Sequence, residues 1–271
     1  MFRSIALGLV LLMSTWVAVQ AQPVPIRIAV STSWLESAIG DIAGEQASIL
    51  RLCPPGTCPG HYDISPGAVK ELRECRLLFR FHFQQGMDSR LRSFGAEIIS
   101  ITAPEGLCIP EKYLVACEEV CKVLIRTYPD HRTLFEKRQS SVRARLNKLK
   151  DELHEKISGA GLKGIRVLSS GHQAAFCEWL GLSVHSTFSG GESLTPGQIQ
   201  SILKTSAQAQ VRYVIGNKQE GLQAAETLAH HLKVPLVVFS NFPDMTEQQM
   251  DFDSLVRKNV RNLIEASHGS S

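Results

Sequence analysis

The sequence predicts an α/β protein with two lobes of parallel sheet flanked by helices and joined by one long rigid helix. Three observations support this fold class. Short apolar strands alternate with helical segments early in the chain, the alternation resumes late in the chain, and residues 130–158 between them contain no proline or glycine. Strand–helix alternation is typical of parallel sheets covered by helices, because parallel strands need long crossover connections.

The first lobe is expected within residues 22–128. Proline and glycine dominate the segment 53–60, which we therefore expect to be a loop. Ser65 and Pro66 have the residue types of a helix cap and a first helical position. The expected strands are 26–30, 47–52, 77–83 and 97–101, and the expected helices are 32–43, 87–94 and one that begins at Pro66.

The segment 129–159 is expected to be the linking helix. Its apolar residues recur at helical spacing, and the remaining positions are largely charged or polar. Gly159 and Gly161 end the pattern. The apolar positions are Phe135, Val142, Leu146, Leu149, Leu153 and Ile157.

The second lobe is expected within residues 160–271, where the alternation of strands and helices resumes. Thr195 and Pro196 have the residue types that begin a helix. The expected strands are 165–169, 184–188, 211–215 and 235–239, and the expected helices are 174–180, 197–207, 221–232 and 250–266.

Residues 1–21 have the pattern of a secretory signal peptide. Arg3 precedes an apolar run, and the small residues Val19 and Ala21 occupy the positions that a signal peptidase requires. The apolar core is too short to favour a permanent membrane anchor, and no other stretch is apolar enough to span a bilayer. We therefore expect cleavage after Ala21 and a periplasmic protein without membrane insertion.

The charge balance gives no indication of a strongly charged partner. The chain has 29 basic and 26 acidic residues, and removal of Arg3 with the signal leaves 28 and 26. A balance so close to neutral favours neither nucleic acid nor a membrane surface as the partner.

Seven cysteines remain after cleavage. Disulfides are compatible with an exported chain, but an odd count leaves at least one thiol unpaired in a monomer. Cys53 and Cys58 bracket the loop before His61, where they either close a small disulfide loop or bring a thiolate near that histidine. The sequence does not give the pairing. The cysteines are Cys53, Cys58, Cys75, Cys108, Cys117, Cys121 and Cys177.

Four segments together resemble the metal-binding (zinc/manganese/iron) family of solute-binding proteins of ABC transporters. The first contains an opening strand and helix, the second and third each contain a histidine, and the fourth is a late helix–strand unit. The order and spacing of the segments carry the resemblance, which covers almost the whole mature chain. The segments are Ile26–Trp34, Pro59–Pro66, Gly171–Phe176 and Leu194–Ile199 with the following 211–219.

The resemblance implies a metal ion in the cleft between the lobes. His61 and His172 match the histidines of the family's ligand loops. Glu105 falls where the family usually has another histidine. All three follow expected strands, and the carboxyl ends of parallel strands are where open α/β sheets bind ligands. The expected site therefore draws ligands from both lobes.

The fourth ligand is left open by the sequence. The family's late acidic residue falls near Ser240 or Asn241, and another acidic position of the family falls at Asn217. We take Asn241 as the candidate, with Ser240, Asn217 or a cysteine such as Cys108 as alternatives.

Two imidazoles and one carboxylate favour Zn²⁺, because borderline metals bind nitrogen and oxygen donors together well. A site richer in carboxylates would favour Mn²⁺, so Mn²⁺ and Fe²⁺ are the alternative ions. The resemblance also implies a monomer that binds the ion without turnover and passes it to the membrane permease of an ABC transporter.

Other functions are also compatible with the sequence. The altered ligands and many cysteines suit a periplasmic metal store or chaperone, or a family member that has lost its metal and binds another ligand. An enzyme is disfavoured because the sequence contains no Cys-x-x-Cys, no His-Glu-x-x-His and no nucleophile elbow.

Overall fold

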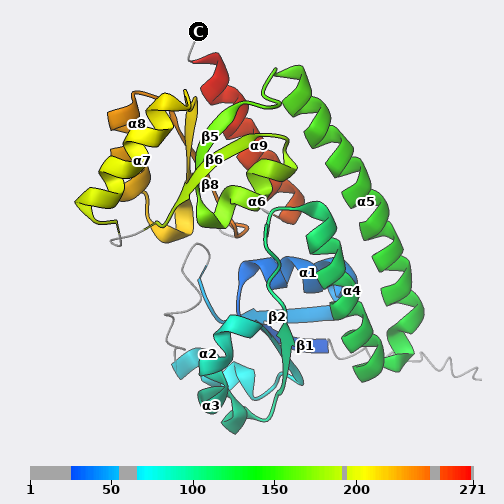
Figure 1. Ribbon diagram of the computed structural model, residues 1–271. Helices are drawn as coiled ribbons and strands as arrows, with labels where there is room; N and C mark the ends of the chain where they lie inside the picture. Colours follow the sequence, from blue (N-terminus) through cyan, green and yellow to red (C-terminus); the bar gives the residue numbers. More distant parts are fainter. Residues whose placement is uncertain (1–25, 55–65, 191–193, 245–250, 270–271) are drawn as a thin grey trace, which may run out of the picture.

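Two four-stranded parallel sheets form the centres of two lobes, which confirms the fold class expected from the sequence (Figure 1). The structure is a computed structural model that describes residues 26–54, 66–190, 194–244 and 251–269. The expected signal peptide and His61 lie outside these ranges.

In the first lobe the strand order is β2-β1-β3-β4. Every residue of β3 is buried, as expected for a central parallel strand, and the one charged residue of that strand, Arg80, pairs with Asp88 at 2.6 Å. The strands are β1 (Ile26–Val30), β2 (Ala47–Arg51), β3 (Leu77–Phe81) and β4 (Glu97–Ile101), and the helices are α1 (Ser33–Ala43), α2 (Pro66–Leu72), α3 (Asp88–Leu91) and α4 (Pro110–Thr127).

The second lobe repeats this arrangement with the strand order β6-β5-β7-β8. In this order the chain runs outward in opposite directions from the central pair, so the crevice between β5 and β7 is the switch point of the sheet. The strands are β5 (Arg166–Ser170), β6 (Ser183–Phe188), β7 (Tyr213–Asn217) and β8 (Leu236–Phe239), and the helices are α6 (Gly171–Trp179), α7 (Pro196–Gln208), α8 (Gln223–Leu232) and α9 (Phe252–His268).

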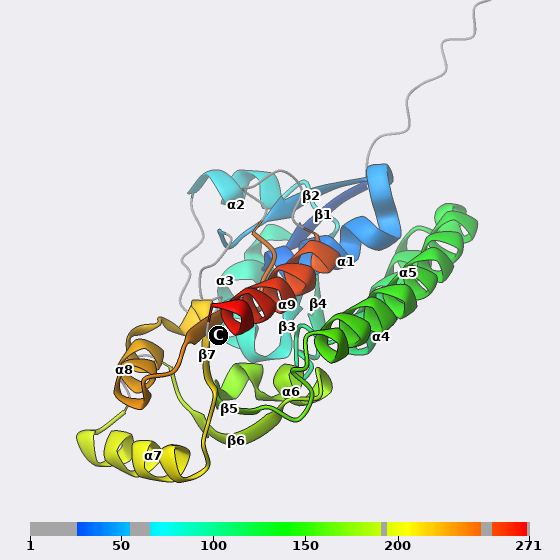
Figure 2. The same ribbon diagram turned by 90° about the horizontal axis from the view of Figure 1, so that it is seen from above.

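The long helix α5 (Arg132–Gly159) runs along both lobes. Its buried residues are the six apolar positions that the sequence pattern indicates. At 28 residues it is about 42 Å long, which is enough to reach from one lobe to the other. It packs against α1 and α4 of the first lobe, and α9 of the second lobe lies beside it (Figure 2).

A partly buried polar network joins α5 to both lobes. Arg145 of α5 donates to both carboxylate oxygens of Asp41 in α1, at 2.8 and 2.7 Å, and the Tyr113 hydroxyl donates to Asp41 at 2.8 Å. The Arg145 Nε also lies 3.3 Å from an oxygen of Asp253, at the start of α9. Next to Asp253, the Phe252 ring stacks on Tyr113 with 3.8 Å between centroids. One arginine thus contacts carboxylates from each lobe.

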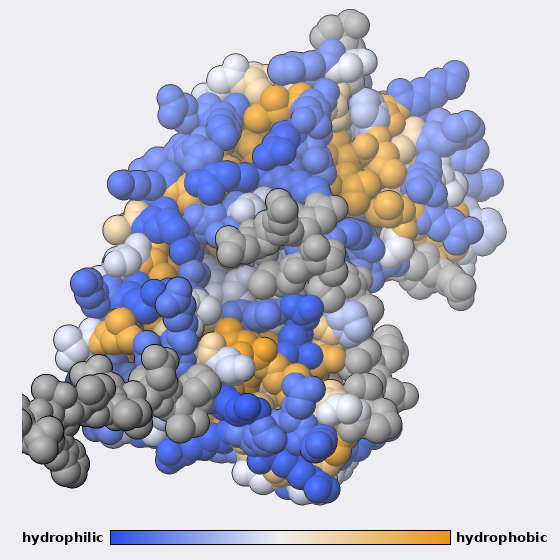
Figure 3. Space-filling model, turned by 180° about the vertical axis from the view of Figure 1, so that it is seen from behind, coloured by the Kyte–Doolittle hydropathy of each residue, from blue (hydrophilic) through white to orange (hydrophobic). Residues whose placement is uncertain are grey.

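The lobes share a hydrophobic core. A single apolar cluster contains residues of α1 and β3, of α5, and of α6 and α9. Polar residues cover most of the face seen from behind, and the apolar areas on that face are separated (Figure 3). Among the described residues, Phe83 and Val115 are the large apolar side chains that are exposed. No described helix is long and apolar enough to cross a membrane.

Two expected strands differ from the structure by two residues, and the others agree with it to within one residue at each end. β3 ends at Phe81, and His82 begins a short 3-10 helix, because the Gln84 side chain accepts a hydrogen bond from the Phe81 amide and turns the chain. β7 begins two residues later than expected, at Tyr213, since Gln210 adopts a left-handed conformation (φ 52°) after α7. The strand also ends two residues later than expected, so Asn217 is its last residue.

The ion pair between Glu152 of α5 and Arg257 of α9 should stabilise the protein only above acidic pH. Hydrogen bonds from Arg257 and Lys156 lower the pKa of Glu152 from 4.5 to about 2. The contribution is present above pH 4.5 and is lost as the pH falls towards 2, because protonation then neutralises the carboxylate.

We expect Glu152→Gln to lower the free energy of unfolding by about 0.5–1 kcal/mol at neutral pH, a range typical of partly exposed pairs. Urea unfolding at several pH values measures this, and the difference from the unmodified protein should shrink below pH 4.5. The matched control is Glu155→Gln, which removes an exposed carboxylate of the same helix. A difference that stays constant with pH would contradict the role of Glu152.

Candidate metal site

The carboxyl edge of the second sheet brings His172 and Glu220 to its switch point. β5 ends at Ser170, and α6 begins at once with Gly171, so His172 lies in the first turn of a helix and not in a loop as expected. On the other side of the crevice, β7 is followed by a 3-10 turn that ends at Glu220. Ligands of open α/β sheets bind at this place.

The two side chains face each other. His172 Nε2 lies 3.4 Å from Glu220 Oε1. The imidazole is 68% exposed, whereas the Glu220 side chain is only 19% exposed. The other oxygen of Glu220 accepts a hydrogen bond from the buried Ser170 hydroxyl. Ser170 precedes α6 but does not cap it with its side chain, because the hydroxyl binds Glu220 instead.

Gly190 lies directly against Glu220. A Cβ atom added at Gly190 would be 2.4 Å from the Glu220 Cβ and 3.0 Å from its carboxylate carbon. Such distances are too short for any side chain at this position without a shift of Glu220. The absence of a side chain at Gly190 therefore leaves the space that the Glu220 carboxylate occupies.

A cluster of amides lies next to this pair, and it includes Asn241. Gln173 is fully buried, and its Nε2 donates to Asn217 Oδ1 at 3.2 Å and to Asn241 Oδ1 at 3.0 Å. Asn217 and Asn241 are themselves only 3% and 5% exposed. The Oε1 of Gln173 is buried without a hydrogen-bond partner among the described residues. The amide oxygen of Asn241 is thus already an acceptor within the protein.

The segment of Ser240 and Asn241 is held tightly by neighbouring side chains. Asn259 of α9 accepts from the Ser240 amide at 3.0 Å and donates to its carbonyl at 2.9 Å. Gln219 donates to the Ser240 hydroxyl at 2.8 Å and accepts from the Asn241 amide at 2.9 Å. The Cys108 thiol lies 3.1 Å from the Ser240 carbonyl, and burial raises the pKa of this thiol far above its usual value. Cys108 is therefore a protonated donor in this arrangement.

Glu105 belongs to the first lobe, in a loop that contacts the second lobe. It is exposed and lies in the loop between β4 and α4. The next residue, Gly106, has φ +77°, and a Cβ there would be 2.4 Å from Ile109 and 3.3 Å from Ala175 of α6. The Trp34 indole donates to the Leu107 carbonyl at 2.9 Å and fixes the same loop. The loop of Glu105 thus packs against the helix that begins beside His172.

Not all expected ligands can be placed. His61 and Cys58 lie outside the described residues, so their expected contribution to the site stays a prediction. Within the ranges that the structure describes, no group of three or more His, Cys, Asp or Glu side chains gathers to hold a metal. The structure brings together His172 with Glu220, and separately Asn241 with Asn217 through Gln173.

No sequence motif indicates Glu220 as a ligand. The one sequence feature that points to it is its position three residues after the strand β7. That position becomes informative once the strand order places β7 beside β5, and strand order cannot be read from a single sequence.

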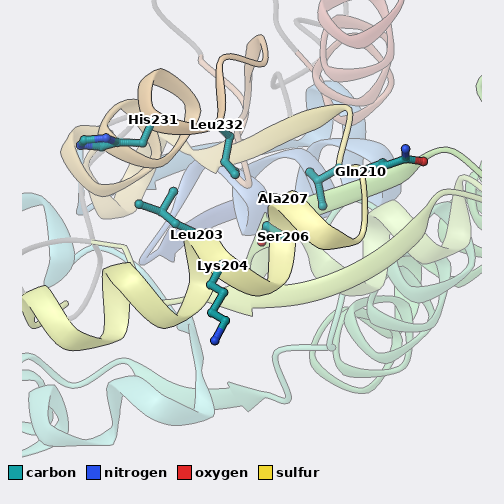
Figure 4. Close-up of a pocket in the computed structure, with 8 residues that line it drawn as sticks. Leu203, Lys204, Ser206, Ala207, Gln210, His231 and Leu232 are labelled. Carbon is teal, nitrogen blue, oxygen red and sulfur yellow. The ribbon is translucent and has the colours of Figure 1, made fainter.

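A surface pocket of about 520 Å³ lies elsewhere, between the ends of α7 and α8 (Figure 4). Leu203 and Leu232 line it, and Lys204 and His231 are the charged or titratable residues around it. Both helices end there and lead into β7 and β8, so the pocket lies at the amino edge of the sheet, opposite the site of His172.

Comparisons with known proteins agree with this fold. A chain from Chlamydia trachomatis serovar D, described as a putative metal-binding protein, is 20% identical over 238 residues, which is 80% of this chain and 85% of that protein. A crystal structure of a ZnuA deletion mutant with bound zinc has a TM-score of 0.75 at 17% identity and covers 90% of this chain and 98% of its own.

Two further solved structures are similar. The periplasmic zinc-binding protein TroA from Treponema pallidum has a TM-score of 0.74 at 14% identity, with 90% of this chain and 99% of that chain covered. A manganese-bound periplasmic protein from Candidatus Liberibacter asiaticus has a TM-score of 0.74 at 13% identity, with 89% and 99% covered. At these identities the likeness shows the shared fold.

The model of one protein family matches residues 28–266, through both lobes and the helix between them. That family is described as the zinc-uptake complex component A, periplasmic (ZnuA). Its members are binding components of transport systems and not enzymes. The chain belongs to this family of periplasmic metal-binding proteins.

Proposed function

We propose that the protein captures a zinc ion in the cleft between its lobes and delivers it to the permease of an ABC transporter. The observation that carries this proposal is the position of His172. Its imidazole is exposed at the switch point of the second sheet, and the loop of Glu105 from the first lobe packs against the same helix. An ion bound there would contact both lobes.

The proposed ligands come from both lobes. His61 and Glu105 would supply an imidazole and a carboxylate from the first lobe, and His172 an imidazole from the second. Asn241, the fourth residue of the expected set, lies in the second lobe beside the buried amides. Nitrogen and oxygen donors in this proportion form a common zinc set, in which one position is open or weakly filled.

The donor chemistry favours zinc over manganese. Related folds include zinc-bound and manganese-bound proteins, so the fold alone does not select the ion. Two imidazoles favour zinc, because manganese prefers a site dominated by carboxylate and carbonyl oxygens. The expected signal peptide supports export to the periplasm, where a monomer would meet the permease.

We expect about one zinc ion per chain when residues 22–271 are produced in a bacterial periplasm and purified without chelators or a histidine tag. Elemental mass spectrometry of the purified protein measures the content directly. Manganese or iron at the same ratio would retain the receptor function and change the ion. A chain that contains no metal, and takes up none when zinc, manganese or iron is added, would contradict the proposal.

His172→Ala should weaken zinc binding by about 100-fold or more, because it removes a nitrogen ligand that contacts the ion directly, and outer contacts alone cost about 10–100-fold. The unfolding temperature should change little, since the side chain is 68% exposed. Competition with a chromophoric chelator measures the affinity. His185→Ala, an exposed histidine of β6, is the matched control, and equal affinities of the two variants would contradict the assignment of His172.

A further inference from the structure

We propose that Glu220 is a direct carboxylate ligand of the metal ion, at the switch point of the second sheet. This inference rests on the proposed metal capture and deepens it. The expected ligands of the second lobe are His172 and the amide of Asn241, and Glu220 would add a carboxylate to them.

The distance between His172 and Glu220 fits two ligands of one ion. The 3.4 Å between Nε2 and Oε1 is longer than an ordinary N–H···O hydrogen bond, which is about 2.7–3.2 Å. Zinc bonds to nitrogen and oxygen are about 2.0–2.2 Å, and in a tetrahedron they place neighbouring donor atoms about 3.3–3.5 Å apart. The pair therefore has the separation of one edge of a zinc tetrahedron.

The orientation of Glu220 is fixed by its neighbours. The Ser170 hydroxyl holds one carboxylate oxygen, and Gly190 lies against the side chain from Cβ to the carboxylate. The remaining oxygen is the one that faces His172. A ligand whose second oxygen is hydrogen-bonded by the protein is the usual arrangement at metal sites, because the outer contact orients the ligand.

The charge of Glu220 has no cation to balance it among the described residues other than His172. The neighbouring Lys218 pairs instead with Asp244, at 3.5 Å. A carboxylate that is only 19% exposed costs free energy unless its charge is paired. A divalent cation bound between Glu220 and His172 would supply that pairing.

The competing amides are occupied. The Asn241 oxygen accepts from Gln173, and its backbone amide donates to Gln219. The Asn217 oxygen also accepts from Gln173. The Asn241 oxygen also lies 3.8 Å from the Cys108 thiol, so donors already face both of its lone pairs. The uncharged amide oxygen of either asparagine is also a weaker ligand than the Glu220 carboxylate.

The same contact admits a positioning role, in which Glu220 only orients the His172 ring. The two roles are separated by comparing Glu220→Gln with Glu220→Ala. A glutamine keeps an oxygen that can accept from the imidazole, so it would preserve much of a positioning effect. It removes the charge of the ligand, as alanine does, and leaves only a neutral amide oxygen, which binds a metal more weakly.

We therefore expect both Glu220→Gln and Glu220→Ala to weaken zinc binding by more than about 100-fold, which exceeds the loss typical of outer contacts. Chelator competition measures the affinity, and cobalt(II) replacing zinc reports the ligand set through its visible absorption, which should change in both variants. The matched control is Glu226→Gln, an exposed carboxylate of α8, and it should leave affinity and spectrum unchanged. Circular dichroism confirms that each variant is folded.

The outcomes separate this inference from the proposed function. If the unmodified protein binds zinc and Glu220→Gln binds it equally well with the same cobalt spectrum, Glu220 is not a ligand and the capture function stands. A weakened Glu220→Ala beside a near-normal Glu220→Gln would reduce Glu220 to a positioning residue. If the unmodified protein binds none of zinc, cobalt, manganese and iron, both the function and the ligand assignment fail.

Gly190→Ala gives an independent test that leaves the carboxylate in place. The added methyl group would collide with Glu220 and displace it, because the contact at 2.4 Å involves the Cβ atom and not a flexible end. We expect zinc affinity to fall by about 10–100-fold, as for other changes that misplace a ligand. Gly197→Ala, at a site with no atom within 4 Å, is the matched control, and equal affinities would contradict the role of the contact.

Discussion

The contact of Arg145 with carboxylates of both lobes helps to fix how the two lobes face each other. Arg145 donates two hydrogen bonds to Asp41 and lies 3.3 Å from Asp253, so it connects α1, α5 and α9 at one point. Burial raises the pKa of Asp253 in spite of this neighbour. The Arg145 side chain is 38% exposed, so solvent screens part of its charge and the network adds little net stability, but Asp253 is only 7% exposed and would lose its nearest cation without Arg145. The network therefore specifies one arrangement of the lobes more than it stabilises the fold.

That arrangement is consistent with the proposed site, whose ligands come from separate lobes. The shared apolar core and the stack of Tyr113 on Phe252 leave the lobes little freedom to separate. The loop of Glu105 packs against α6 through the protein's own side chains. A site that is organised in advance loses less conformational entropy on binding, and this increases its affinity. Metal capture in this protein is thus compatible with small movements of the lobes.

Much of the fold could be predicted from the sequence. The apolar spacing from Phe135 to Ile157 identified the buried face of α5, and the strands β1 and β4 have the expected bounds. These features depend on local periodicity, which a sequence contains directly. The start of β7 was predicted wrongly, because the left-handed turn at Gln210 has no strong sequence signal.

The candidate site was less predictable, because its contacts depend on strand order. His172 was recognised from its motif, but its place in the first turn of α6 was not. Glu220 meets His172 only because β5 and β7 are neighbours in the sheet, although 48 residues separate the two in the chain. The hydrogen bonds that occupy Asn241 come from Gln173 and Gln219, which no motif connects to it. His61 stays a prediction.

The buried thiols have a consequence for how the chain must fold. Burial raises the pKa of Cys75 to about 11 and that of Cys177 to about 12, and it raises the pKa values of Cys108, Cys117 and Cys121 as well. Oxidants react with the thiolate, so the raised pKa values disfavour oxidation of these groups in the folded protein. They have no such protection in the unfolded chain, where a thiol has its ordinary pKa of about 8.5. In an oxidising compartment such as the periplasm, correct folding therefore requires that these sulfur atoms are buried faster than they are oxidised.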